Sequence, residues 1–172
     1  PIHFDKKGKT IEEVDIENFC YNKPFIINKA LKKGGLIQPE DLRTADPKIY
    51  RSDILLVCTG YHAFRYDRNF YMNDFPALSV ETAKFIRQEL LNIKAVAIDS
   101  LSIESSVMGP VQNYAVHKTF LSSEIYKTRT LLIFEDVNIG AVLGKKIKRI
   151  FAFPIRMAGL EASPVSIVAE VF

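Results

Sequence analysis

The sequence has few of the residues from which several common kinds of site are built. Its two cysteines, Cys20 and Cys58, form no CxxC spacing, which excludes a cysteine-rich zinc module and a disulfide framework. No stretch approaches the roughly 18 apolar residues that a membrane-spanning helix needs, and the start of the sequence shows no signal-peptide pattern. We therefore expect a protein of the reducing cytoplasm that has no membrane partner.

Positive and negative charges nearly balance in this sequence. The formal net charge is +3 over 172 residues, and the lysines are scattered apart from the short run KKIKR at residues 145–149. Because no aromatic residues alternate with this run in a stacking pattern, a solvated loop is favoured over a nucleic-acid surface. We expect no nucleic-acid partner.

Length and composition fit one folded domain. The chain is 48% hydrophobic and 25% charged, which is ordinary for a single globular core of this length. It contains no internal repeat, low-complexity tract or linker. Apolar strands and amphipathic helices alternate, which indicates an α/β protein. Strands are predicted over residues 24–28, 53–58, 95–98, 130–134, 150–153 and 163–172, and helices over 38–42 and 79–90.

A helix followed by an apolar strand, within residues 113–138, carries two candidate site residues. His117 lies on a half-apolar helix face, and Glu135 follows the strand 130–134 at its carboxyl end. A carboxylate there is costly to desolvate unless it is paired, hydrogen-bonded or metal-bound. Both residues could equally be structural, with Glu135 beside Asp136 as a solvated strand end. Their separation of 18 residues is no metal signature on its own.

Two further features lie earlier in the chain. Asp99 directly follows the strand 95–98, at the kind of strand end where ligands commonly gather, although it could simply form a turn. Residues 62–79 predict a long irregular segment that is rich in aromatic side chains. Loops of this length are often binding loops or lids. The aromatic side chains could wall a ligand pocket, or they could pin the segment to the core.

Several short segments occur in an order that matches one family. They are PIHF at 1–4, IQPEDL at 37–42, LLVCTGY at 55–61, PALS at 76–79, AIDSLSI at 97–103, FPI at 153–155 and GLEASPV at 159–165. The first resembles the tail of an HxGTHxDxPxHF motif and the fifth a GIDTxSxD motif. Together with His117 and Glu135, this order resembles the putative cyclase family of metal-dependent hydrolases, which includes bacterial kynurenine formamidase. The resemblance covers nearly the whole chain.

The resemblance implies a single domain over residues 1–172 of the swivelling β/β/α type, with a mixed or barrel-like β core and flanking helices. It implies one or two Zn²⁺ or Mn²⁺ ions, with His117 and Glu135 as ligands and His3 as general acid/base. The HxGTHxD portion would lie before Pro1, so we expect an N-terminal segment that this sequence lacks; loss of the first metal site is the alternative. The resemblance also suggests a homodimer or a higher homo-oligomer.

The chemistry that these residues would support is hydrolysis of an amide by a metal-activated hydroxide. Bound zinc lowers the pKa of water to about 7 and polarises a carbonyl, and imidazole and carboxylate are common zinc ligands. The imidazole of His3 could transfer a proton near neutral pH. Asp99 is predicted to orient a ligand imidazole. The residues that we expect to line a substrate pocket are Phe4, Phe64, Tyr66, Phe70 and Tyr71.

The predicted substrate is a small aromatic amide. N-formylkynurenine, an aryl formamide of tryptophan catabolism, is the leading candidate. The alternative within the hydrolases is a cyclic amide, an isatin-like lactam. The alternative outside them is a non-catalytic small-molecule-binding protein with a degenerate metal site.

Overall fold

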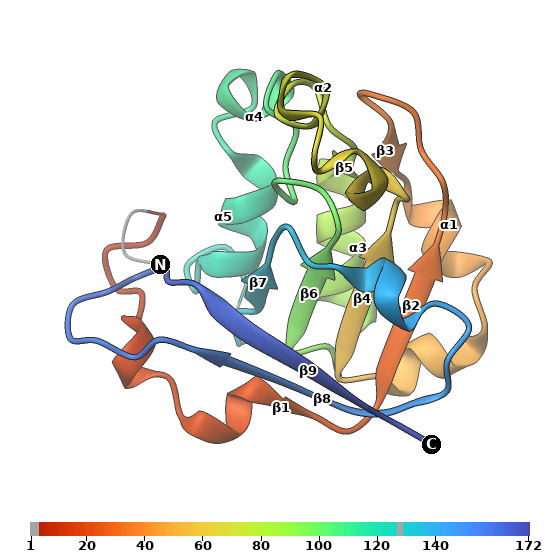
Figure 1. Ribbon diagram of the computed structural model, residues 1–172. Coiled ribbons are helices and arrows are strands. Elements are labelled where there is room, and N and C mark those ends of the chain that lie inside the picture. The colour runs from red at the N-terminus through yellow and green to blue at the C-terminus, as the bar shows by residue number, and fades with distance from the viewer. Residues whose placement is uncertain (1–3, 127–128) are drawn as a thin grey trace.

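The computed structural model describes residues 4–126 and 129–172 and is built in three layers (Figure 1). The middle layer is a parallel sheet whose strands follow the order β2 (Pro24–Asn28), β4 (Ile54–Cys58), β6 (Ala95–Ile98) and β7 (Leu132–Phe134). One face is covered by an antiparallel sheet of β1 (Cys20–Tyr21), β8 (Ile147–Pro154) and β9 (Val165–Val171). Helices cover the other face. The predicted α/β class and its β/β/α layering are confirmed.

The helices are short. They are α1 (Pro39–Arg43), α2 (Arg68–Tyr71), α3 (Val80–Glu89), α4 (Met108–Val111) and α5 (Ala115–Leu121), with 3₁₀ turns η1 (Ile11–Glu13), η2 (Ile16–Phe19), η3 (Pro47–Arg51), η4 (Tyr61–Phe64) and η5 (Ile139–Val142). A small parallel pair, β3 (Leu36–Ile37) and β5 (Ala77–Leu78), completes the fold. Within the described residues, no helix is long and apolar enough to cross a membrane.

Apolar side chains on both faces explain the place of the parallel sheet. Every residue of β4 and β6 is buried. Leu55 and Val57 pack on the helix side, whereas Ile54 and Leu56 pack toward the antiparallel sheet. In Figure 1, β8 and β9 cross in front of the parallel strands and α3 lies behind them. Continuous apolar runs without charge are what a strand covered on both faces requires.

Local signals explain where the principal helix begins. The hydroxyl of Ser79 accepts a hydrogen bond from the backbone N–H of Thr82 at the start of α3, as its cap position predicts. The segment 62–79, which was predicted to be irregular, is partly regular, because it holds part of η4 together with α2 and β5. The carboxylate of Asp67 caps α2 by accepting from Phe70 N–H. The prediction of an irregular segment was wrong for these short elements, because a one-turn helix gives too few residues for a periodic pattern, and the remainder of the segment is irregular.

The parallel strands end at one edge of their sheet, and polar residues follow several of them there. Thr59 follows β4, Asp99 follows β6, and Glu135 follows β7. Since ligand sites of open α/β sheets lie at the carboxyl ends of the strands, this edge is where a functional site is expected.

Candidate metal centre

Two groups of polar side chains lie at this edge. The first, called here the His117 cluster, consists of His117, Glu104 and Glu135. The second, called the Asp99 cluster, consists of Asp99, His62, Thr59 and Cys58.

Glu104 fixes the imidazole of His117 and the helix that carries it. Its Oε2 atom lies 2.6 Å from Nδ1 of His117. The same carboxylate accepts hydrogen bonds from the backbone N–H groups of Val116 at 3.0 Å and His117 at 3.2 Å. Tyr114, at the cap position of α5, provides no side-chain cap. The buried carboxylate of Glu104 therefore satisfies the open amides at the start of α5 and orients the ring at the same time.

Glu135 lies on the opposite side of the ring. Its Oε1 atom accepts hydrogen bonds from the hydroxyl of Ser102 at 2.7 Å and the backbone N–H of Ile103 at 2.8 Å, and it lies 3.3 Å from Nε2 of His117. The ring of Phe4 stacks on the imidazole with centroids 4.9 Å apart and planes 13° apart. The imidazole is thus held by a carboxylate at each nitrogen and by an aromatic ring on one face.

The electrostatics of the cluster favour a positive charge on this ring. Burial opposes the charged imidazole, but the hydrogen bonds and charges of Glu104 and Glu135 outweigh burial and raise the pKa of His117 to about 9. Burial also opposes the charge of Glu135, yet the hydrogen bonds from His117, Ile103 and Ser102 lower the pKa of this carboxyl below its usual value. Without a metal ion, His117 and Glu135 form an imidazolium–carboxylate pair at neutral pH.

The donor atoms of the pair also fit a divalent cation. Two ligand atoms at about 2.1 Å from a tetrahedral zinc ion lie about 3.4 Å apart, close to the 3.3 Å between Nε2 of His117 and Oε1 of Glu135. Because Glu104 engages Nδ1, the proton of a neutral ring sits there and Nε2 keeps its lone pair for an ion. Nitrogen and oxygen donors in a partly covered, negatively charged cluster suit zinc or manganese.

Asp99, which was predicted to orient a ligand imidazole, lies beside the imidazole of His62 and not beside that of His117. It is fully buried and accepts from the backbone N–H and hydroxyl of Thr59 at 2.8 and 2.6 Å and from the N–H of Gly60 at 2.9 Å. Its Oδ2 atom lies 2.7 Å from Nδ1 of His62. Asp99 therefore orients the imidazole of His62, and Glu104 has the corresponding place beside His117.

The Asp99 cluster is a second possible metal site. Cys58, His62 and Asp99 each offer one donor atom, and these atoms lie within 4.8 Å of one another. However, Nδ1 of His62 and Oδ2 of Asp99 lie 2.7 Å apart, a hydrogen-bond distance that is shorter than the roughly 3.4 Å between two ligands of one tetrahedral zinc ion. Burial also raises the pKa of the Cys58 thiol to about 11, so binding of an ion by its thiolate would have to release a proton. The His117 cluster is the better candidate.

The aromatic candidates separate into two groups. Phe4 contacts the His117 cluster. Phe64, Phe70 and Tyr71 pack with Tyr61 in an aromatic group, with ring centroids 4.6 to 5.6 Å apart, that holds the segment after β4 against the protein. The side chain of Tyr66 is 98% exposed. His3, the predicted general acid/base, lies outside the described residues.

Two residues at this edge were missed by the sequence reasoning. Glu104 stands at the last, acidic position of the GIDTxSxD-like segment, one residue beyond the part that was compared, so a signal for it existed. His62 had no signal, because nothing local shows that it lies beside Asp99, which is 37 residues away along the chain.

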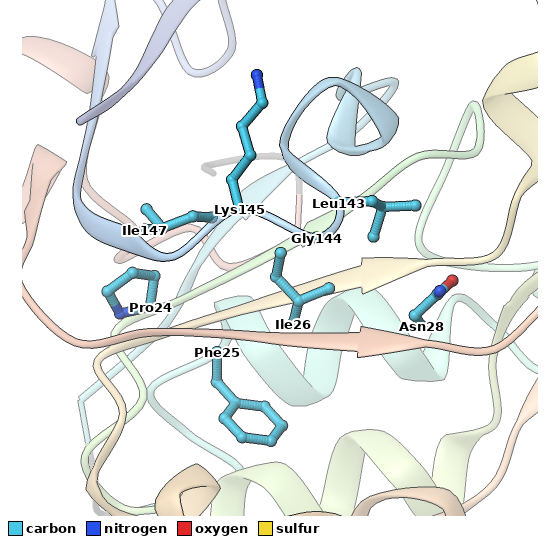
Figure 2. A pocket seen from close by; sticks show the side chains of 8 residues that line it. All are labelled: Pro24, Phe25, Ile26, Asn28, Leu143, Gly144, Lys145 and Ile147. Atoms are coloured by element: carbon cyan, nitrogen blue, oxygen red, sulfur yellow. The ribbon is translucent and has the colours of Figure 1, made fainter. Parts of the chain in front are cut away.

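A hollow elsewhere on the surface is unrelated to these clusters. It has a volume of about 370 Å³ and lies beside the edge strand β2. Figure 2 shows Ile26 of this strand directed toward Leu143, in the turn that follows η5. Its lining residues are Pro24, Phe25, Ile26, Asn28, Leu143, Gly144, Lys145 and Ile147. None of them belongs to the His117 or Asp99 cluster, so this hollow is not part of the candidate metal centre.

Comparison with solved structures places the fold. Isatin hydrolase A from Labrenzia aggregata, solved with benzyl benzoate, has a TM-score of 0.76 at 15% identity, over 96% of this chain and 66% of that one. Isatin hydrolase A from Ralstonia solanacearum has a TM-score of 0.74 at 14% identity, over 96% of this chain and 65% of that one. A predicted metal-dependent hydrolase from Bacillus stearothermophilus has a TM-score of 0.67 at 20% identity, over 98% of this chain and 72% of that one. The chain thus spans slightly less than two thirds of the two isatin hydrolases.

Sequence comparison gives the family. An uncharacterized protein of Haemophilus influenzae is 26% identical over 97 residues, which are 56% of this chain and 68% of that protein. A family model described as putative cyclase matches residues 1–105, more than half of the chain. With the fold of the cyclase-family metal-dependent hydrolases and this match, the chain belongs to the putative cyclase family.

Proposed function

We propose that this chain is a metal-dependent hydrolase that binds a divalent ion through Nε2 of His117 and Oε1 of Glu135. The observation that carries the proposal is the approach of these two atoms to 3.3 Å, with both groups held by further hydrogen bonds. The family membership supports the same function.

Each residue of the His117 cluster has a distinct task in this proposal. Glu104 holds the Nδ1 proton and so directs Nε2 toward the ion. Ser102 and Ile103 hold Oε1 of Glu135. Phe4 covers one face of the imidazole and keeps water from it. A divalent ion, when bound, supplies Lewis acidity toward a carbonyl and a lowered pKa of water.

The proton for the leaving nitrogen is assigned to His3. This residue precedes Phe4, whose ring lies against His117, so the chain at position 4 runs beside the candidate metal centre. Replacement of His3 by alanine is expected to abolish turnover and to leave the metal content unchanged. Loss of the metal in the same variant would contradict the assignment.

The proposed substrate is an amide of a small aromatic molecule. An aryl formamide such as N-formylkynurenine is the first candidate. A cyclic amide is the second, and the likeness of the fold to two isatin hydrolases supports it. Turnover of N-formylkynurenine, other aryl formamides, isatin and simple lactams by the purified protein separates the two.

The deciding measurement is the metal content per chain of protein expressed from its whole gene. One to two equivalents of zinc or manganese are expected by elemental analysis. The His117→Ala variant should contain less metal than the wild type. A wild-type protein that stays metal-free after incubation with excess zinc would overturn the proposal, and the non-catalytic binding protein would become the better description.

A further inference from the structure

The backbone makes an unusual turn directly after Glu135. Asp136 has a φ of 56°, in the left-handed region. The chain is fixed on both sides of this residue, because Asp136 N–H donates to the carbonyl of Ser100 at 2.8 Å and Val137 N–H donates to that of Ile98 at 2.9 Å. A residue with a Cβ adopts this conformation only rarely, because its Cβ then lies too close to the backbone. Something must hold Asp136 in place.

Two side chains from the segment after β4 hold Asp136. The hydroxyl of Tyr71 donates to Oδ1 of Asp136 at 2.5 Å. The guanidinium of Arg65 reaches the same oxygen from Nε at 2.9 Å and the backbone carbonyl of Asp136 from a terminal nitrogen at 2.8 Å. The side chain and the backbone of Asp136 are therefore both anchored by residues more than sixty positions away in the sequence.

Tyr71 is itself a rigid support. Its side chain is buried, and its ring stacks on Tyr61 with centroids 5.6 Å apart. Its hydroxyl oxygen also lies 3.1 Å from the carbonyl oxygen of Asp99, so it sits between the ends of β6 and β7. Because the hydroxyl has a single proton, the bond to the charged carboxylate of Asp136 is the dominant one.

We propose that Tyr71 and Arg65 are positioning residues for Glu135, which they fix through the left-handed turn at Asp136. The inference rests on the proposed role of Glu135 as a metal ligand. Ser102 and Ile103 hold the end of the Glu135 side chain, whereas Asp136 sets the direction in which that side chain leaves the backbone. If the anchor is lost, the turn relaxes toward ordinary backbone angles and Oε1 moves relative to Nε2 of His117.

The test compares zinc dissociation constants, measured by isothermal titration with a competing chelator at a temperature where all variants are folded. Tyr71→Phe removes one oxygen and keeps the ring. Asp136→Gly keeps the left-handed turn accessible and removes the anchor. Both are expected to bind zinc about tenfold more weakly, the scale on which groups that orient a ligand act. Tyr50→Phe, which removes a hydroxyl from an exposed tyrosine of η3 outside both clusters, is the matched control and should bind as the wild type does.

A conservative variant distinguishes positioning from a general loss of stability. Asp136→Asn tolerates the left-handed conformation, and its amide oxygen can accept from Tyr71 and Arg65. It should therefore retain near wild-type zinc affinity although it loses the charge. If Tyr71→Phe fails to fold, Arg65→Met carries the same expectation, because its side chain lies nearer the surface.

The outcomes separate this inference from the proposed function. Wild-type zinc affinity in both Tyr71→Phe and Asp136→Gly would overturn the positioning role and leave the metal site standing. Equal loss of zinc affinity in Asp136→Asn and Asp136→Gly would also overturn the positioning role. The asparagine can still accept hydrogen bonds from Tyr71 and Arg65, so equal losses would mean that these bonds do not hold Glu135. A wild-type protein without zinc affinity would remove both proposals together.

Discussion

The carboxylate of Glu104 holds His117 in two ways, by its Nδ1 atom at 2.6 Å and by its backbone N–H, in the first turn of α5, at 3.2 Å. One buried side chain therefore sets both the position of α5 and the direction of the imidazole. The other ring nitrogen, Nε2, consequently faces Glu135, at the edge where the parallel strands end.

Glu104→Gln is expected to weaken zinc binding about ten- to a hundredfold, the usual effect of removing a group that orients a ligand imidazole. The amide cannot accept from Val116, His117 N–H and Nδ1–H with the strength of a carboxylate, so the ring loses its fixed tautomer. Competition titration measures the effect. The same change at exposed Glu89 serves as the control, and equal affinities of the two variants would contradict the role of Glu104.

The stability of the metal-free protein should fall as the pH rises through about 9. The pKa of His117 is raised from 6.5 to about 9 in the folded state, so its stabilisation is complete below pH 6.5 and is lost as the pH passes 9. The shift corresponds to at most about 3 kcal/mol. Urea unfolding with a chelator between pH 6 and 10 should show the advantage of the wild type over His117→Gln shrinking. A constant difference would contradict the ion pair.

Asp99→Asn is expected to lower the free energy of unfolding by about 2–4 kcal/mol. The carboxylate is fully buried and only accepts, from Thr59, Gly60 and His62. An amide nitrogen in its place would face one of these donors. Chemical denaturation gives the change, with Asp15→Asn at an exposed site as the control. Equal stabilities of the two variants would show that the network contributes little.

Gly140→Ala is expected to cost roughly 1–3 kcal/mol, as over-packing commonly does. A Cβ at position 140 would overlap the ring of His62, which Asp99 holds at Nδ1. Removing the ring in the double variant Gly140→Ala, His62→Ala should relieve the clash, so the two costs should not add. Thermal or urea unfolding of the four proteins in the cycle measures the coupling, and strict additivity would exclude the contact.

The regular elements of the core were the most predictable part of the fold. The uninterrupted apolar runs of β4 and β6 and the cap of α3 by Ser79 are local signals, and the structure confirms them. The predicted strand 130–134 was too long, because β7 begins at Leu132. The backbone N–H of Leu131 instead donates to the carbonyl of Phe120, which lies in α5, the helix before the strand. A backbone partner of this kind cannot be deduced from apolar character alone.

By itself, the sequence determined the α/β class and the buried apolar strands, and it pointed to the family and to His117 and Glu135 as candidates, since these depend on local periodicity and on motifs in a fixed order. The tertiary structure alone decided which partners these residues have. Glu104 beside His117, His62 beside Asp99, and Tyr71 with Arg65 on Asp136 are pairs separated by 13 to 71 residues. Such contacts form because parallel strands bring their carboxyl ends to one edge, a relation that no local pattern records.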